Sequence, residues 1–159
     1  MIEKKENVDI LPLFKKSLQI AKEMYETKSY EVYFSGLEAS KYLQEKLKDK
    51  AFFDNLNDDE KIDRMHGNWW IYSSLLEARS LNIDYLRNNK EKFNMPEETI
   101  EKIILLLNKE VNILKEGIPC VPSRWINPDP KVWTQELRDS QAKIIERFAE
   151  CEKAISEYL

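Results

Sequence analysis

The sequence has little glycine, little cysteine and a single histidine. Three glycines and two cysteines occur among its 159 residues. The scarcity of glycine, together with the absence of Asn-Gly and Asp-Gly pairs, argues against a fold built from tight β-hairpins. Cys120 and Cys151 lack the paired spacing that is typical of a disulfide framework or a zinc site. One histidine is too few for a zinc or di-iron centre, so we expect no metal and no other cofactor.

Long apolar runs and a basic excess are also missing. The strongest apolar run, residues 103–107, is far shorter than the roughly 20 residues that cross a bilayer. The first residues are too polar for a signal peptide. A net charge of −4 provides no basic field that would gather nucleic acid. These absences predict a cytoplasmic protein that binds neither membranes nor nucleic acid.

Recognisable catalytic motifs are absent as well. The chain contains no glycine-rich phosphate loop and no serine in a Gly-x-Ser-x-Gly elbow. It also has no Glu-x-x-His pair of the kind that binds iron in helical bundles. Because no set of catalytic residue types converges in the sequence, we do not expect an enzyme.

The residues that are abundant favour helices. The composition is 42% hydrophobic and 34% charged, and Glu, Lys and Leu lose little conformational freedom on entering a helix. Apolar residues recur at helical spacing in five segments, which are residues 9–26, 30–49, 58–88, 95–116 and 130–158. The sequence therefore predicts an all-α fold.

Several sequence signals mark where these helices begin and end. Asn57 and Asn94 are each followed three residues later by a glutamate, which is the pattern of a capping box. Gly117 stands where a helix is expected to stop, and Asp129 precedes a proline as the cap of the last helix. We expect an antiparallel bundle of about five helices, with a four-helix-bundle-like core plus an extra helix. It forms a single domain over residues 9–159, after a disordered tail at residues 1–8.

The first candidate site is a polar strip on the third predicted helix. His66, Trp70, Ser73 and Glu77 share one face of this helix, and Tyr72 lies nearby. Buried polar groups need partners, so this strip is a candidate lining for a pocket that takes a small planar or acidic ligand. His66 and Glu77 are about 16 Å apart along the helix, too far to act on one atom. The plainer interpretation is a solvated His66 beside core tryptophans.

The second candidate site is the proline-rich loop at residues 117–130, which contains four of the six prolines. A stiff loop presents side chains to a partner at a low entropic cost. Arg124 and Trp125 belong to the residue types that are enriched in binding hot spots, and Cys120 is a candidate thiol in the same loop. Alternatively, the loop folds back as a lid over one end of the bundle.

These observations favour a non-enzymatic helical interaction or regulatory protein. Its expected partner is a protein or a second copy of the chain rather than a small molecule. The alternative is a small-molecule-binding domain or enzyme with a pocket beside the third helix, at His66 and Trp70.

Overall fold

The computed structural model describes residues 10–123, 125–127 and 129–158, and most of them are helical. The elements are α1 (Ile10–Glu26), β1 (Ser29–Tyr30), β2 (Tyr33–Phe34), α2 (Gly36–Lys48), α3 (Lys50–Asp54), α4 (Asp58–Asn89), η1 (Lys90–Lys92), α5 (Glu97–Gly117), η2 (Ile118–Cys120), η3 (Pro130–Val132) and α6 (Gln135–Ser156). The predicted all-α helical bundle is confirmed. The tail predicted at residues 1–8 lies outside the described residues. No helix within the described ranges is long and apolar enough to cross a membrane.

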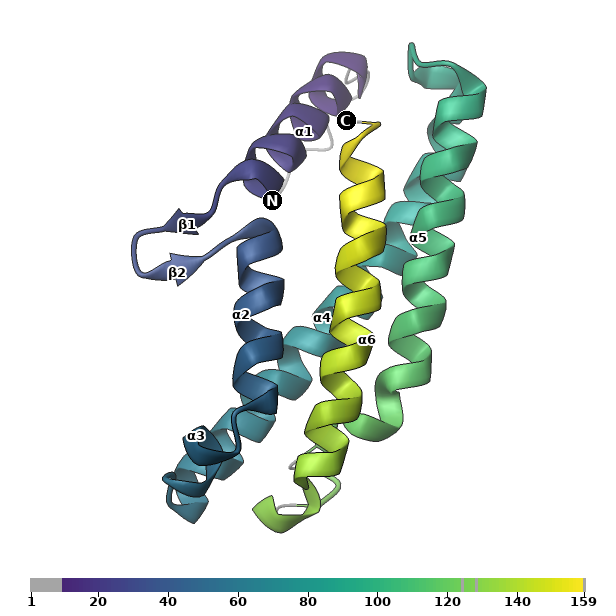
Figure 1. Ribbon diagram of the computed structural model, residues 1–159. Coiled ribbons are helices and arrows are strands. Elements are labelled where there is room, and N and C mark those ends of the chain that lie inside the picture. Colours follow the sequence, from purple (N-terminus) through teal and green to yellow (C-terminus); the bar gives the residue numbers. More distant parts are fainter. Residues whose placement is uncertain (1–9, 124, 128, 159) are drawn as a thin grey trace, which may run out of the picture.

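The long helices pack as an open ring (Figure 1). α2 lies against α6, α6 against α5, and α5 against α4. The fourth side of the ring, between α2 and α4, has little direct helix-to-helix contact. α1 and the short β1–β2 hairpin stand at this open side and rest mainly on α2. The arrangement leaves one seam of the bundle without tight packing.

Two hydrophobic clusters form the core. The first lies where α2, α3, α4, α6 and the end of α5 meet and includes Leu47, Met65, Leu114, Ile145 and Phe148. The second joins α1 to the first half of α5 and includes Phe14, Phe93, Ile100, Ile103 and Leu107. The hydrophobic stripe predicted over residues 95–116, which form α5 in the structure, accounts for much of the second cluster. The members of this stripe recur at steps of three and four.

Local capping signals predicted the start of α4 correctly and the start of α5 incorrectly. The Asn57 side chain accepts from the Glu60 amide and the Glu60 side chain accepts from the Asn57 amide, each at 2.9 Å. The structure starts α5 at Glu97, with Pro96 as the residue before it and no side-chain cap. Pro96 has an extended conformation, with ψ of 131°. The prediction that Asn94 caps this helix was therefore wrong.

The predicted limits of the proline-rich loop were also wrong at both ends. Gly117 is the last residue of α5 and has φ of −82°, so it is not a left-handed stop. Asp129 caps only the short η3 turn, where its side chain accepts from Lys131. α6 begins later, and Thr134 caps it by accepting from the Leu137 amide. The prolines thus separate α5 from α6 as expected, but single 3₁₀ turns occupy part of the segment.

The start of the second predicted helix is a β-hairpin instead. Tyr30 pairs with Tyr33 across the antiparallel β1–β2 ladder, and Glu31 in the turn has a positive φ of 51°. α2 begins only at Gly36, whose φ is 52°. A Cβ atom at Gly36 would overlap the carbonyl oxygen of Tyr25. Glycine is needed here both for the backbone conformation and for the close approach of α1.

Candidate functional site

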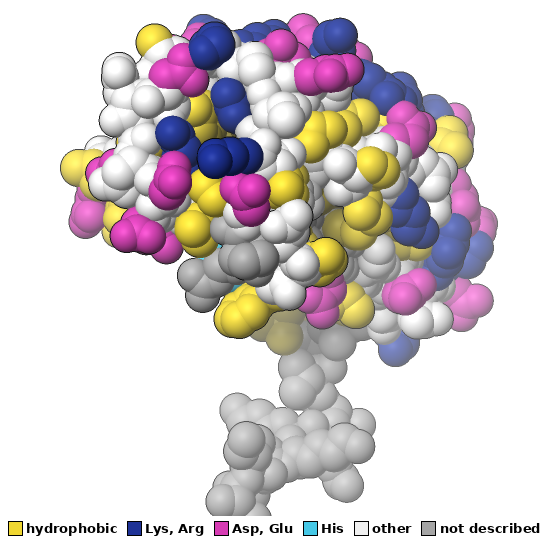
Figure 2. Space-filling model, turned by 90° about the horizontal axis from the view of Figure 1, so that it is seen from below, with side chains coloured by type: hydrophobic (Ala, Val, Ile, Leu, Met, Phe, Trp, Pro, Cys, Tyr) yellow, Lys and Arg dark blue, Asp and Glu magenta, His cyan; other side chains and the backbone are white. Residues whose placement is uncertain are grey.

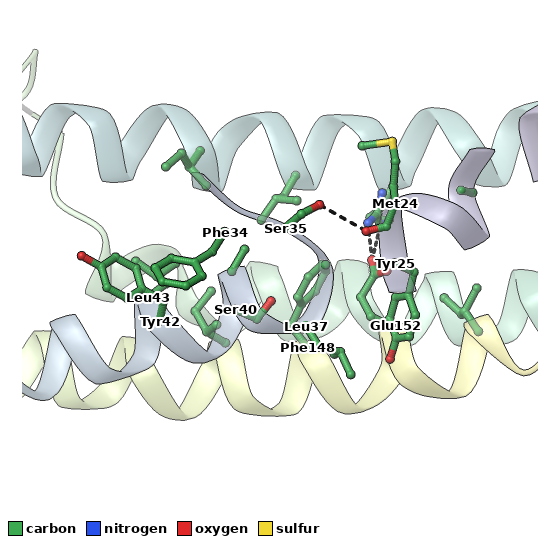
Figure 3. A pocket seen from close by; sticks show the side chains of 18 of the residues that line it. Met24, Tyr25, Phe34, Ser35, Leu37, Ser40, Tyr42, Leu43, Phe148 and Glu152 are labelled. Carbon is green, nitrogen blue, oxygen red and sulfur yellow. Dashed lines mark hydrogen bonds and ion pairs between the residues drawn. The ribbon is translucent and has the colours of Figure 1, made fainter. Parts of the chain in front are cut away.

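A cavity of about 1190 Å³ fills the seam between α2 and α4. Figure 3 shows α4 on one side of it and α2 and α6 on the other. Its apolar lining includes Leu18, Leu37, Leu43, Ile71, Leu75 and Phe148. Met24, Val32 and Tyr33 also line it and are largely exposed. The cavity is therefore open to solvent beside the hairpin.

Small residues on the facing helices create this space. Ala39 and Ser40 on α2 and Gly67 on α4 all line the cavity. A Cβ atom added at Gly67 would meet nothing within 4 Å. Large side chains at these positions would fill the seam, as they do between α5 and α6. The volume is a direct result of the choice of residues at these positions.

The cavity is much larger than an ordinary packing defect. Protein interiors have few voids larger than a water molecule, whereas this space is about 1190 Å³ and is open to solvent. The seam therefore has room for solvent or a ligand.

One end of the cavity is polar and acidic. Glu152 and Arg79 line the cavity there, and Arg79 Nε lies 2.8 Å from Oε1 of Glu152 and 2.9 Å from Oε2 of Glu110. The Arg79 and Glu152 side chains are about one-fifth exposed, whereas Glu110 is fully buried. Burial and the neighbouring Glu152 carboxylate raise the pKa of Glu110 to about 8, against the opposing effect of Arg79. Two carboxyl groups thus share one guanidinium.

This buried carboxyl group makes stability depend on pH. An unfolded glutamate loses its proton near pH 4.3, whereas folded Glu110 keeps it to about pH 8. Stability falls with rising pH wherever the folded state binds more protons, so Glu110 should lower the free energy of unfolding progressively between about pH 5 and 8. Urea denaturation across this pH range should show that the free energy of unfolding falls less steeply with pH for Glu110→Gln, whose side chain stays neutral. If the free energy of unfolding depends on pH in the same way in both proteins, the raised pKa does not belong to Glu110.

The opposite end of the cavity is aromatic and basic. Phe34 and Tyr42 lie together there, with ring centroids 4.6 Å apart. Lys46 and Arg64 line this end from α2 and α4, and both approach the ring of Phe52. The cavity is therefore an apolar space with a paired Arg79 and Glu152 at one end and two cationic side chains at the other.

The structure brings the two sequence-predicted sites together on another side of α4. Trp70 Nε1 donates to His66 Nε2 at 2.9 Å, and Trp125 from the loop lies with its ring centroid 5.4 Å from His66. His66 Nδ1 is buried and has no hydrogen-bond partner within the part of the chain that the structure describes. Neither His66 nor Trp70 lines the large cavity. Arg124 lies outside the described residues.

The remaining predicted pocket residues line a separate, smaller cavity of about 370 Å³. Tyr72, Ser73 and Glu77 face Ile118 there. The Tyr72 hydroxyl donates to the carbonyl oxygen of Leu114 at 2.6 Å, and burial raises the pKa of Tyr72. This hydrogen bond gives Tyr72 a structural role between α4 and α5.

Cys120 in the proline-rich loop is half-buried, with a free thiol. Burial raises the pKa of this thiol, which lowers the fraction of reactive thiolate at neutral pH. Within the described ranges, no group of three or more His, Cys, Asp or Glu side chains is arranged to hold a metal ion.

Comparison with protein-family models, curated proteins and solved structures gave no match. The geometry of the cavity therefore carries the functional argument. Sequence reasoning missed the cavity residues of α1, the hairpin and α2. The available signal was the set of small residues Gly36, Ala39 and Ser40, which follow a Tyr-Glu-Val-Tyr-Phe run of strand-forming residue types at residues 30–34.

Proposed function

We propose that the protein binds an elongated apolar small molecule in the cavity between α2 and α4. The volume of about 1190 Å³ carries this proposal, because ligand pockets are typically about 300–1,000 Å³ and mostly apolar, with a few polar groups. Arg79, Glu152 and Lys46 are such polar groups, and they lie at the ends of the cavity. We thus favour the small-molecule alternative that the sequence left open. The proposed pocket lies along the face of α4 that carries Gly67 and Ile71, and not along the face that carries His66.

An apolar dye tests this function directly. N-phenyl-1-naphthylamine, which is neutral and fluoresces in apolar surroundings, should bind with one site per chain and be displaced by dodecan-1-ol. A ligand at 100 times its dissociation constant adds about 2.7 kcal/mol of stability. For a chain of this size we expect the melting temperature to rise by about 5–10 °C. If neither compound binds or shifts the melting temperature, the proposal is wrong.

An exposed apolar patch supports self-association as a second function. Trp70, Trp125 and Ile126 are 54%, 67% and 88% exposed, and tryptophan is enriched in binding hot spots. Figure 2 shows that hydrophobic side chains also reach the surface among charged ones at the end of the bundle that carries α3. Sedimentation velocity should show a dimer that Trp125→Ala with Ile126→Ala dissociates. A wild-type protein that stays monomeric up to about 100 μM, a weak-affinity range, would exclude this function.

A further inference from the structure

Two cationic side chains stand at one end of the cavity and belong to its opposite walls. Lys46 Nζ of α2 lies 4.9 Å from the ring centroid of Phe52, and the guanidinium carbon of Arg64 of α4 lies 5.8 Å from the same centroid. Because both lie near one ring, the two charged groups are at most 10.7 Å apart (4.9 Å plus 5.8 Å). Both side chains also line the cavity. The end of the apolar space is thus bracketed by two positive charges.

These charges are only weakly neutralised by the protein itself. Lys46 lies 3.9 Å from Asp49, a carboxylate that also accepts a hydrogen bond from the Phe52 amide. Arg64 makes no ion pair with any residue of the described ranges. Glu60, one helical turn before Arg64, uses its carboxylate to cap α4. The charged side chains that line the aromatic end of the cavity are therefore the two cations Lys46 and Arg64.

The other end has the opposite character. The Arg79 guanidinium already has an anionic partner in Glu152 and a second hydrogen-bond acceptor in Glu110, which keeps its proton to about pH 8. An anionic ligand at this end would compete with Glu152 for Arg79 and would be repelled by the Glu152 carboxylate, which lines the cavity. These charges therefore favour one orientation of an anionic ligand, with its charged group at Lys46 and Arg64 and not at Arg79.

The cavity is long enough to hold one hydrocarbon chain. Arg64 and Arg79 stand fifteen residues apart on α4, which is about 22 Å at 1.5 Å per residue. A single acyl chain spans about half of the roughly 30 Å hydrocarbon core of a bilayer. Between the two charged ends lie apolar side chains such as Ile71 and Leu75. A single chain fits between the ends with its head group at the cationic one.

Exposure at the cationic end suits a charged head group. The Lys46 side chain is 34% exposed and Arg64 is exposed. A head group between them keeps part of its hydration, and this avoids the large cost of burying a charge completely. The tail gains the hydrophobic free energy of burial along the seam.

We infer that the cavity takes a single-chain anionic amphiphile, with its head group held by Lys46 and Arg64 and its tail directed toward Glu152. The inference rests on the proposed binding of apolar molecules and adds the charge of the ligand and its direction. Partly exposed charges contribute modestly. We therefore expect an anionic head to improve affinity about tenfold over a neutral head on the same chain.

The test compares three probes of equal chain length. Isothermal titration calorimetry at low salt and below the micelle concentration should rank dodecanoate tightest, dodecan-1-ol about tenfold weaker and dodecylammonium weakest. The double substitution Lys46→Gln with Arg64→Gln should remove the advantage of dodecanoate and change dodecan-1-ol binding by less than about twofold. Lys48→Gln with Arg87→Gln removes the same charge from α2 and α4 at exposed positions outside the cavity lining, and it should leave the ranking unchanged.

Each other outcome has a definite meaning. Equal affinity for dodecanoate and dodecan-1-ol in the wild-type protein would overturn the head-group assignment and leave the apolar cavity standing. Tightest binding of dodecylammonium would place the head at Glu152 and reverse the direction. Failure of all three probes would refute the proposed function itself. If the double variant does not fold, the wild-type advantage of dodecanoate must shrink between about 20 and 300 mM salt, since salt screens exposed charges.

Discussion

Substituting tryptophan for Ser40 is expected to abolish the binding of apolar ligands and, at the same time, to stabilise the unliganded protein. Ser40 lies between Leu37 and Leu43 in the middle of the cavity (Figure 3). An indole at this position would occupy the space that we assign to the ligand. It would also bury apolar surface against α4, and filling a cavity commonly adds about 0.5–2 kcal/mol.

The combination of opposite effects separates this result from general damage. Dye binding should fall below detection, whereas urea denaturation should give a higher free energy of unfolding. Lys41→Trp adds the same side chain one residue further along α2, at an exposed position outside the cavity lining. This control should bind the dye normally. If Ser40→Trp keeps wild-type affinity, ligands do not occupy the seam.

Gly117→Ala is expected to destabilise the protein by about 2–4 kcal/mol, although alanine is normally the better helix former. A Cβ atom at Gly117 would overlap the Tyr72 hydroxyl and lie 2.9 Å from Cγ2 of Ile144. Overpacking a core costs about 1–3 kcal/mol. Displacing Tyr72 would also break its hydrogen bond to Leu114, and an unsatisfied buried hydroxyl costs about 1–3 kcal/mol more.

A double-mutant cycle assigns the loss to this contact. Tyr72→Phe removes the hydroxyl that the new methyl group meets, so Gly117→Ala should cost at least about 1 kcal/mol less in the Tyr72→Phe background. Gly67→Ala is the matched control, because a Cβ atom there has open space. It should stabilise the protein by about 0.5–1 kcal/mol. Additive effects of the two substitutions in the cycle would show that the Tyr72 hydroxyl is not the obstacle.

The parts of the fold that depend on neighbouring residues were predictable from the sequence. The Asn57–Glu60 capping box and the apolar stripe of α5 are short-range signals, and both appear in the structure. The hairpin before α2 was missed because the helical spacing of Tyr33, Gly36 and Leu37 extends through it. Gly36 has a positive φ and lies where the Tyr25 backbone leaves no room for a Cβ atom, and periodicity does not report a tertiary contact of this kind.

The cavity could not be predicted from the sequence for a related reason. Its volume depends on α2 facing α4 across a seam, and the order of helices around the bundle is a tertiary property. The hydrogen bond from Trp70 to His66 joins residues one turn apart, so the shared helix face was readable. The approach of Trp125 to that pair was not, because it joins α4 to a loop far along the chain. The roles predicted for these residues stay predictions.

α1 is held at its two ends and loosely between them. Phe14 stacks on Phe93 with ring centroids 3.7 Å apart, and Ser35 donates to the Met24 carbonyl oxygen at 3.2 Å. Leu13, Ile20 and Met24 remain exposed. A segment with so few buried contacts opens at a lower free energy than the rest of a domain. We therefore expect α1 to unfold locally while α4, α5 and α6 stay folded, and for the ligand that we propose, the local stability of α1 should set the rate of escape.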